Sequence, residues 1–119
     1  MDITVWYLST CSTCLRILKD LQLDNTNARL IDIKKNPLTE DEIEKMYEAV
    51  GSYKALINGR STQFREMDRK AKDLTENEAR QLLLTHYAFL KRPVIKMDEQ
   101  YFVGNSKKVV EEAKKIIND

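Results

Sequence analysis

The chain has 119 residues, a length typical of one domain with a substantial buried core. Charged residues make up 33% of it and the formal net charge is +1, so the marked basic excess of a general nucleic-acid binder is absent. No apolar run approaches the roughly 18 residues that a membrane helix needs, and no secretory signal series precedes the first apolar run. We therefore expect a cytoplasmic, monomeric protein that binds neither a membrane nor nucleic acid directly.

The first third of the chain has a strand–helix–strand pattern. Residues 3–8 are rich in β-formers and predict a buried strand, and a helix is predicted from about residue 12 to residue 23. The apolar residues at helical spacing in this helix include Leu15, Leu18 and Leu21. Residues 24–27 form a turn cluster, and residues 28–33 alternate as a second strand. A helical crossover of this length predicts that the two strands are parallel.

Two capping boxes start the longer helices predicted in the middle of the chain. Thr39 is followed by Glu42, and Thr75 is followed by Glu78, at the spacing that satisfies the first backbone N–H groups of a helix. The first helix should end at Gly51, and the second near residues 85–86. The residues expected on the buried faces are Ile43, Met46, Tyr47 and Val50 in the first helix, and Ala79, Leu82 and Leu83 in the second.

The remaining segments complete an α/β pattern. A short helical piece at 53–57, a turn at 58–61 and a charge-rich stretch at 64–73 lie between the two capped helices. Residues 94–97 and 100–103 then predict a β-hairpin, followed by a turn with a plausible N-cap and a closing helix. The apolar residues expected to face inward from this helix are Val109, Val110, Ala113, Ile116 and Ile117. The sum predicts a thioredoxin-like α/β fold with a mixed four-stranded sheet, as one domain with a helical insertion at about 38–90.

Both cysteines lie at the turn from the first strand to the first helix. A Cys-x-x-Cys at such a turn is typical of a thioredoxin-like redox site. The first turn of a helix has unpaired N–H groups and the positive end of the helix dipole, which stabilise a thiolate. We expect Cys11 to be the nucleophile and Cys14 the resolving thiol, because positions i and i+3 meet on one helical turn. The hydroxyls available to a thiolate or a bound oxyanion are those of Ser9, Thr10, Ser12 and Thr13.

Two other interpretations of the cysteines remain open. A zinc site would need two more ligands, and only His86 remains among the usual soft donors, so we expect no metal. The second alternative is that both cysteines are small apolar core residues. His86 itself lies near a predicted helix C-terminus, where dipole pairing or packing is expected.

Two arginines are candidates for binding an anion. Arg60 lies in the predicted turn at 58–61, and Arg92 directly precedes Pro93. A guanidinium is a planar fork of donors that suits an oxyanion and lowers the pKa of a nearby thiol. The alternative is that each arginine is a solvated surface charge. In thioredoxin-like folds a cis-proline faces the active cysteine, which makes Arg92–Pro93 a candidate cis peptide bond.

Four motifs in this order resemble the arsenate reductase (ArsC)/Spx family of the thioredoxin-like superfamily. They are Cys11-Ser12-Thr13-Cys14, Asn58-Gly59-Arg60-Ser61, Leu90-Lys91-Arg92-Pro93-Val94-Ile95 and Phe102-Val103-Gly104. The resemblance covers essentially the whole chain and implies a thioredoxin-like fold with a helical insertion.

One branch of that family is the glutaredoxin-coupled arsenate reductases. The resemblance implies that Cys11 attacks the substrate, that Arg60 and Arg92 hold the oxyanion, and that glutathione and glutaredoxin, or thioredoxin, supply thiols without a bound cofactor. The expected substrate is then a small anion or glutathione. The chain differs from these enzymes in two ways. They usually have serine and then arginine at the positions of Cys14 and Leu15, and they carry a third arginine beyond the final hairpin.

The other branch is the Spx-type transcription regulators. They have a Cys-x-x-Cys at this place, switch by forming its disulfide and bind the α-subunit of RNA polymerase. Gly51 lies near a glycine that those proteins use in the contact, although the spacing from Gly51 to Arg60 is one residue longer here. A Cys11–Cys14 disulfide switch and a polymerase partner are thus the alternative to an enzyme. A catalytically silent family member is a third reading.

Overall fold

The computed structural model describes residues 1–23 and 26–118, which divide into two units. The sheet unit comprises Met1–Asn36 and Arg92–Asp119, and the helical unit comprises Pro37–Lys91. Within the expected turn cluster, Asp24 and Asn25 lie outside the described residues. That the whole chain forms a single domain stays a prediction.

The sheet unit holds the mixed four-stranded sheet that the sequence predicts. Its strands are β1 (Ile3–Tyr7), β2 (Arg29–Asp32), β3 (Val94–Met97) and β4 (Gln100–Val103), in the order β2-β1-β3-β4. β1 and β2 are parallel, as expected for a helical crossover, whereas β3 is antiparallel to both β1 and β4. The central strand β1 therefore depends on pairing with segments from opposite ends of the chain.

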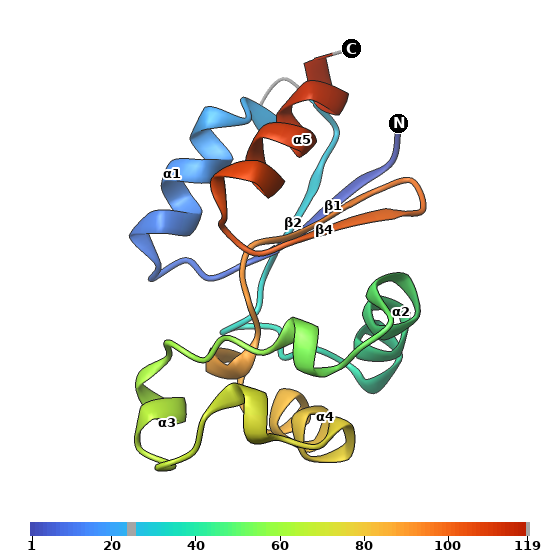
Figure 1. Cartoon of the computed structure of the whole chain (residues 1–119). Helices are drawn as coiled ribbons and strands as arrows, with labels where there is room; N and C mark the ends of the chain where they lie inside the picture. The colour runs from blue at the N-terminus through green and yellow to red at the C-terminus, as the bar shows by residue number, and fades with distance from the viewer. Residues whose placement is uncertain (24–25, 119) are drawn as a thin grey trace. The chain divides into compact units, whose positions relative to one another are not determined.

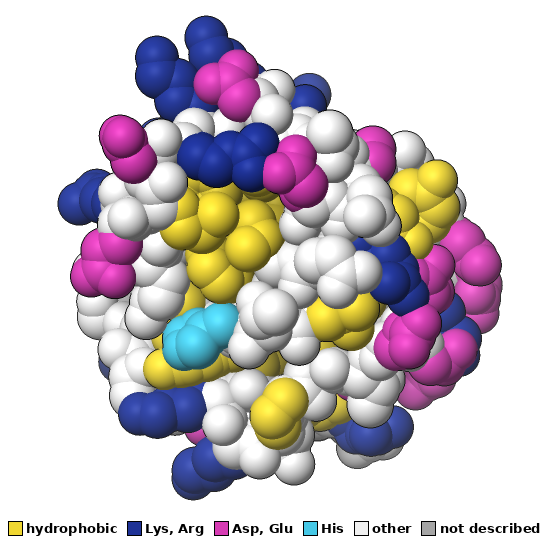
Figure 2. Space-filling view, turned by 90° about the horizontal axis from the view of Figure 1, so that it is seen from below, with side chains coloured by type: hydrophobic (Ala, Val, Ile, Leu, Met, Phe, Trp, Pro, Cys, Tyr) yellow, Lys and Arg dark blue, Asp and Glu magenta, His cyan; other side chains and the backbone are white. Residues whose placement is uncertain are grey.

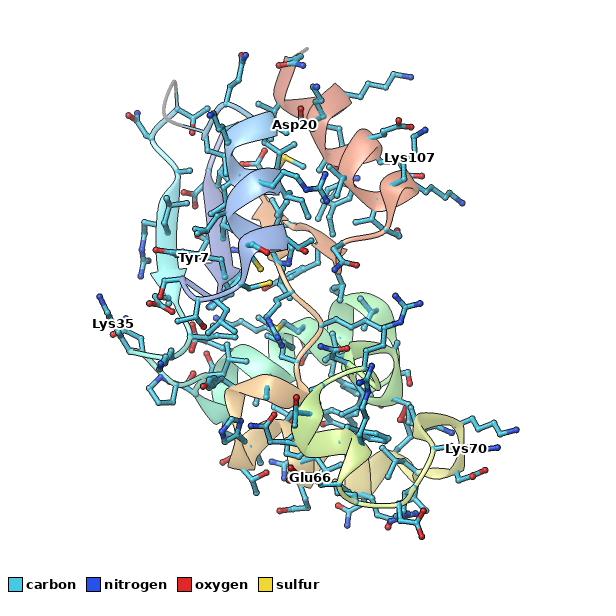
Figure 3. All side chains as sticks on the ribbon, turned by 90° about the vertical axis from the view of Figure 1, so that its left-hand side faces the viewer. Tyr7, Asp20, Lys35, Glu66, Lys70 and Lys107 are labelled. Carbon is cyan, nitrogen blue, oxygen red and sulfur yellow. The ribbon has the colours of Figure 1, made fainter. Side chains whose placement is uncertain are left out.

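Two helices, α1 (Ser12–Asp20) and α5 (Lys107–Asn118), lie side by side on one face of this sheet (Figure 1). Alternate strand residues point toward them because successive side chains of a strand point to opposite faces. The buried residues of this core are Ile3, Val5, Ile17, Leu21, Leu23, Ile95, Met97, Val110 and Ala113. Lys114 Nζ of α5 pairs with Asp20 Oδ1 at the end of α1, 3.1 Å away, and Figure 3 labels Asp20 at this place. On the opposite sheet face, Trp6 stacks on Tyr101.

Two details of the first elements correct the sequence-based expectation. β1 ends at Tyr7 rather than residue 8, because the carbonyl of Leu8 accepts a turn hydrogen bond instead of pairing in the sheet. α1 ends at Asp20 rather than residue 23, since Gln22 has a left-handed φ of 53° that no helix continues through. Leu15 is 47% exposed, whereas Cys14, Ile17 and Leu21 point inward. The buried stripe of α1 thus lies to one side of Leu15.

The helical unit contains the two capped helices at the expected places. α2 spans Glu40–Val50 and α4 spans Glu76–Thr85. Both capping boxes form: the Thr39 and Thr75 hydroxyls accept from the N–H groups of the glutamates, whose carboxylates accept from the two threonine N–H groups. Gly51 follows α2 with φ +81°, a left-handed conformation that glycine adopts without strain.

Four short helical segments complete this unit. They are η2 (Lys54–Leu56), α3 (Thr62–Arg65), η3 (Ala71–Asp73) and η4 (Tyr87–Phe89). The sequence does not predict α3 and η3, since a helix of one turn has no periodicity to detect. Ser61 caps α3 by accepting from the Phe64 N–H, and Phe64 packs edge-on against Phe89.

His86 joins the end of α4 to η4. Its Nδ1 accepts a hydrogen bond from the Ala88 N–H over 2.9 Å, and its ring lies 4.3 Å from that of Tyr87. Figure 2 shows the histidine, in cyan, among hydrophobic side chains. His86 is therefore a cap and a packing residue here. Among the described residues, no helix has the length and apolar character required to cross a membrane.

Candidate functional site

A tight turn places Cys11 at the start of α1. The Cys11 N–H donates to the Leu8 carbonyl over 3.0 Å, and the Cys11 carbonyl accepts the first helical bond from the Leu15 N–H over 3.1 Å. Cys11 is consequently the N-cap residue, with extended backbone angles of φ −98° and ψ 109°. The first turn of α1 contains no acidic residue, so no carboxylate competes for the positive end of the helix. Figure 3 shows this end of α1 close to Tyr7 of β1.

The surroundings of Cys11 favour its thiolate. Burial by itself raises the pKa of the thiol, but interaction with the backbone N–H and thiol of Cys14 and with the Arg92 guanidinium outweighs it, and the net pKa is lowered. The sulfur makes no capping hydrogen bond in the thiol form. When the Cys11 sulfur carries a negative charge, the backbone N–H of Cys14 can donate a hydrogen bond to it. Cys11 is half-buried and Cys14 is fully buried, and both are free thiols.

Cys14 has the opposite character. The pKa of Cys14 is raised to about 11, chiefly by burial and in addition by the neighbouring Cys11 charge. Its side chain has 0% exposure and packs in the sheet unit, as a core residue does. The pair thus combines a thiol of lowered pKa with a thiol of raised pKa on the same helical turn.

Arg92 and Pro93 come from the segment that leads into β3. The Arg92–Pro93 peptide bond is cis, which confirms the expectation from sequence. The Pro93 carbonyl accepts from the Gly104 N–H over 2.9 Å and so fixes this segment to the end of β4. Arg92 interacts with the Cys11 sulfur both by charge and by a side-chain hydrogen bond. Of the two candidate arginines, the structure brings this one to the cysteine.

Arg60 belongs to the helical unit, whereas Cys11 belongs to the sheet unit. The Arg60 N–H donates to Asn58 Oδ1 over 3.0 Å, which fixes the predicted turn, and the side chain is exposed. Its role in anion binding stays a prediction. Ser12 and Thr13 occupy the first two positions of α1, so their backbone N–H groups lie at the helix start.

Sequence reasoning did not single out Asp32, which is 7% exposed at the end of β2. Its Oδ1 accepts from the Ser9 N–H over 3.3 Å and from the Lys34 N–H over 3.2 Å. The only signal in the sequence is an acidic residue inside an alternating apolar run. No group of three or more histidine, cysteine or acidic side chains suited to a metal ion occurs among residues 1–23 and 26–118.

The model of the ArsC family matches residues 6–113. The chain belongs to the ArsC family. It is 28% identical over 107 residues to the uncharacterized protein YusI of Bacillus subtilis, covering 87% of this chain and 91% of that protein. An uncharacterized Haemophilus influenzae protein is 29% identical over 107 residues, covering 89% and 93% of the two chains.

Solved structures confirm the fold of this ArsC-family chain. An arsenate reductase from Vibrio cholerae matches with a TM-score of 0.77 at 15% identity, covering 98% of each chain. An arsenate reductase (ArsC) related protein from Brucella melitensis matches with a TM-score of 0.73 at 24% identity, covering 94% and 93% of the two chains. The fold is therefore that of the ArsC-type thioredoxin-like proteins, and the family is one of thiol-dependent oxidoreductase-like proteins.

Proposed function

We propose that this protein is a cytoplasmic thiol-dependent oxidoreductase of the arsenate-reductase type, acting on a small oxyanion. The observation that carries the proposal is the position of Cys11 at the N-terminus of α1, where Cys14 and Arg92 lower its pKa. A cysteine with a lowered pKa beside a guanidinium is the arrangement needed to attack an anionic electrophile, because the cation offsets the repulsion between the thiolate and the anion.

In the first step, the Cys11 thiolate attacks the arsenic of arsenate. A sulfur–arsenic bond forms, an arsenic–oxygen bond breaks, and the oxygen leaves as water after taking a proton from solvent. Arg92 and the first N–H groups of α1 hold the remaining oxyanion charge. No electrons change hands in this step, so arsenic stays pentavalent.

In the second step, a second thiolate attacks the Cys11 sulfur. A sulfur–sulfur bond forms, the sulfur–arsenic bond breaks with its electron pair going to arsenic, and trivalent arsenite leaves. The two sulfurs are thereby oxidised to a disulfide. Cys14 is buried with a pKa of about 11, so it stays protonated at neutral pH and is a poor nucleophile there. We therefore assign this step to an external thiol, glutathione, and the final reduction of the mixed disulfide to glutaredoxin or thioredoxin.

The presence of Cys14 supports a second candidate function, an Spx-like regulator. Because Cys14 interacts with the Cys11 sulfur, an oxidant could convert the pair into an intramolecular disulfide. That disulfide would then control binding to the RNA polymerase α-subunit. The two candidates differ in the thiol that reacts with Cys11 and in the partner.

The deciding experiment is steady-state reduction of arsenate with glutathione and glutaredoxin, comparing wild type with Cys11→Ser and Cys14→Ser. We expect turnover to disappear in Cys11→Ser and to persist in Cys14→Ser. Loss of turnover in both variants would transfer the second step to Cys14. Absence of turnover in the wild type would reject arsenate as the substrate and favour the regulator, whose test is a pull-down of the polymerase α-subunit with oxidised and reduced protein.

A further inference from the structure

Asp32 is the one buried acidic side chain of the described residues, and its carboxylate reaches the loop that carries Cys11. β1 and β2 are parallel and in register from Thr4 and Arg29 to Tyr7 and Asp32, so both strands end at the same sheet edge. Across this edge, Asp32 Oδ1 accepts the N–H of Ser9, which lies two residues before Cys11. The contact joins positions 23 residues apart in the sequence.

Several backbone N–H groups donate to the carboxylate and to the carbonyl of Asp32. Besides Ser9, the Lys34 N–H donates to the same oxygen, and the Asp32 carbonyl accepts from the N–H groups of Lys35 and Asn36. The Ser9 hydroxyl is the largest influence that lowers the pKa of Asp32. Lys34 and Lys35 are exposed, and Figure 3 shows Lys35 pointing away from the sheet. Hydrogen bonds within residues 32–36 therefore fix Asp32 independently of its contact with Ser9.

The turn that Asp32 holds is anchored at both ends, by the buried Leu8 and by the Cys11 carbonyl, which accepts from the Leu15 N–H. Within it, the Cys11 N–H donates to the Leu8 carbonyl, and Thr10 is exposed. If Ser9 lost its acceptor, the backbone of Ser9 and Thr10 between these two ends could change its angles and shift Cys11. The Cys11 sulfur would then move away from the N–H groups of α1 and from Arg92.

We propose that Asp32 is a positioning residue for the nucleophile, holding the Ser9–Thr10 turn so that Cys11 stays at the N-cap of α1. The inference rests on the proposed role of Cys11 as the reactive thiol. Asp32 touches neither the reacting sulfur nor a substrate in this role. It acts through Ser9, whose N–H donates to Oδ1 and whose hydroxyl lowers the pKa of the carboxyl group.

The loss of the Asp32 charge and the loss of its positioning role predict opposite effects on the alkylation rate of Cys11, which makes the proposal testable. Removal of a negative charge by itself would stabilise a nearby thiolate and speed its alkylation. Loss of position would weaken the helix-terminus interaction and slow alkylation. Asp32→Asn removes the charge but keeps an acceptor oxygen, whereas Asp32→Ala removes both.

The experiment is the pH dependence of iodoacetamide alkylation of Cys11 in the full chain, with the modified residue identified by peptide mass mapping. We expect Asp32→Ala to raise the apparent pKa of Cys11 and to slow alkylation at neutral pH about two- to fivefold, the size of a charge–helix interaction. Asp32→Asn should react at least as fast as wild type. A wild-type rate in Asp32→Ala, or equal slowing in Asp32→Asn, would overturn the proposal.

Ser106→Ala is the matched control. Ser106 accepts from the Val109 N–H at the start of α5, so its loss destabilises the same unit at another helix start. It should lower the melting temperature and leave Cys11 alkylation unchanged. If Asp32→Ala does not fold, Ser9→Pro decides instead, because proline removes the donor N–H at a turn position that accepts it. An ordinary pKa of Cys11 in wild type would reject the nucleophile itself, an outcome distinct from a failure of Asp32.

Discussion

Cys11 and Cys14 occupy the N-cap and the third position of the same helix, yet the structure lowers the pKa of one thiol and raises that of the other to about 11. The difference in pKa follows from how deeply each thiol is buried. Cys11 is half-buried where the backbone N–H groups begin, whereas Cys14 points into the core. One turn of helix thus separates a thiol with a lowered pKa from a thiol with a raised one.

This separation predicts selective labelling. At neutral pH, iodoacetamide should modify Cys11 well before Cys14, because only the thiolate reacts and only Cys11 is accessible. The rate should fall as the pH is lowered through the pKa of Cys11, which lies below the ordinary thiol value. Mass mapping of early time points checks this. Equal labelling of both cysteines would contradict it, and Cys11→Ser should remain almost unlabelled.

The raised pKa of Cys14 predicts a loss of stability at alkaline pH. The thiol titrates near 8.5 in the unfolded chain and at about 11 in the folded one, so the unfolded state loses its proton first. The stabilisation is complete below the unfolded pKa and is lost as the pH rises toward the folded one, by on the order of 3 kcal/mol. Urea unfolding from neutral to alkaline pH should show the stability of wild type declining relative to Cys14→Ala. Parallel curves would contradict this assignment.

Arg92→Ala should raise the pKa of Cys11, because the guanidinium both attracts the thiolate and donates a hydrogen bond to it. We expect alkylation of Cys11 at neutral pH to slow roughly two- to tenfold, corresponding to about 0.4–1.4 kcal/mol. Arg16→Ala is the control, since Arg16 is an exposed arginine one turn into α1, the helix that begins after Cys11. Equal effects of the two substitutions would show that net charge, and not the position of Arg92, sets the reactivity.

Glu78 should make the helical unit sensitive to acid. Its pKa is lowered to about 2, first by the ion pair with Arg69 and then by the Thr75 N–H that its carboxylate caps. A lowered pKa gives stability that is present above the unfolded pKa, near 4.3, and is lost as the pH falls toward the folded one. Glu78→Gln should therefore be less stable than wild type at neutral pH, and the two should converge near pH 2. A gap that persists in acid would contradict this linkage.

Gly51→Ala separates backbone strain from partner binding. Gly51 has φ +81°, and a Cβ atom built there would meet nothing within 4 Å. Alanine should therefore cost about 1 kcal/mol of unfolding free energy through conformation alone, measured by urea denaturation. Asn, which tolerates this region, should cost less. If the regulator interpretation holds, larger residues at Gly51 should weaken the polymerase contact beyond this loss of stability.

Local rules explain why much of the fold could be predicted from sequence. The parallel pairing of β1 and β2 followed from the length of their crossover, and the capping boxes at Thr39 and Thr75 located the two longer helices of the helical unit. α3 was missed because its four residues show no periodicity. The exposure of Leu15 could not be predicted, because apolar spacing does not reveal which flank of a helix faces the sheet.

The candidate site also contains both residues whose place could be predicted from the sequence and residues whose place could not. The relation of Cys11 to α1 is local, so the spacing of the motif sufficed to predict it. Asp32 is different, because its contact with Ser9 exists only once β2 has paired with β1. Arg92 was a candidate by residue type, but its contact with the Cys11 sulfur depends on β3 lying beside β1.

The strand order also affects how the protein is made. β1 leaves the ribosome well before its sheet neighbour β3 and the adjoining Arg92. A nascent chain therefore carries Cys11 without the guanidinium that lowers its pKa and without the central pairing of the sheet. The pKa of Cys11 is therefore lowered by Arg92 only after the segment that carries Arg92 has been made, so the shorter chain exposes a less reactive thiol while its core is still open.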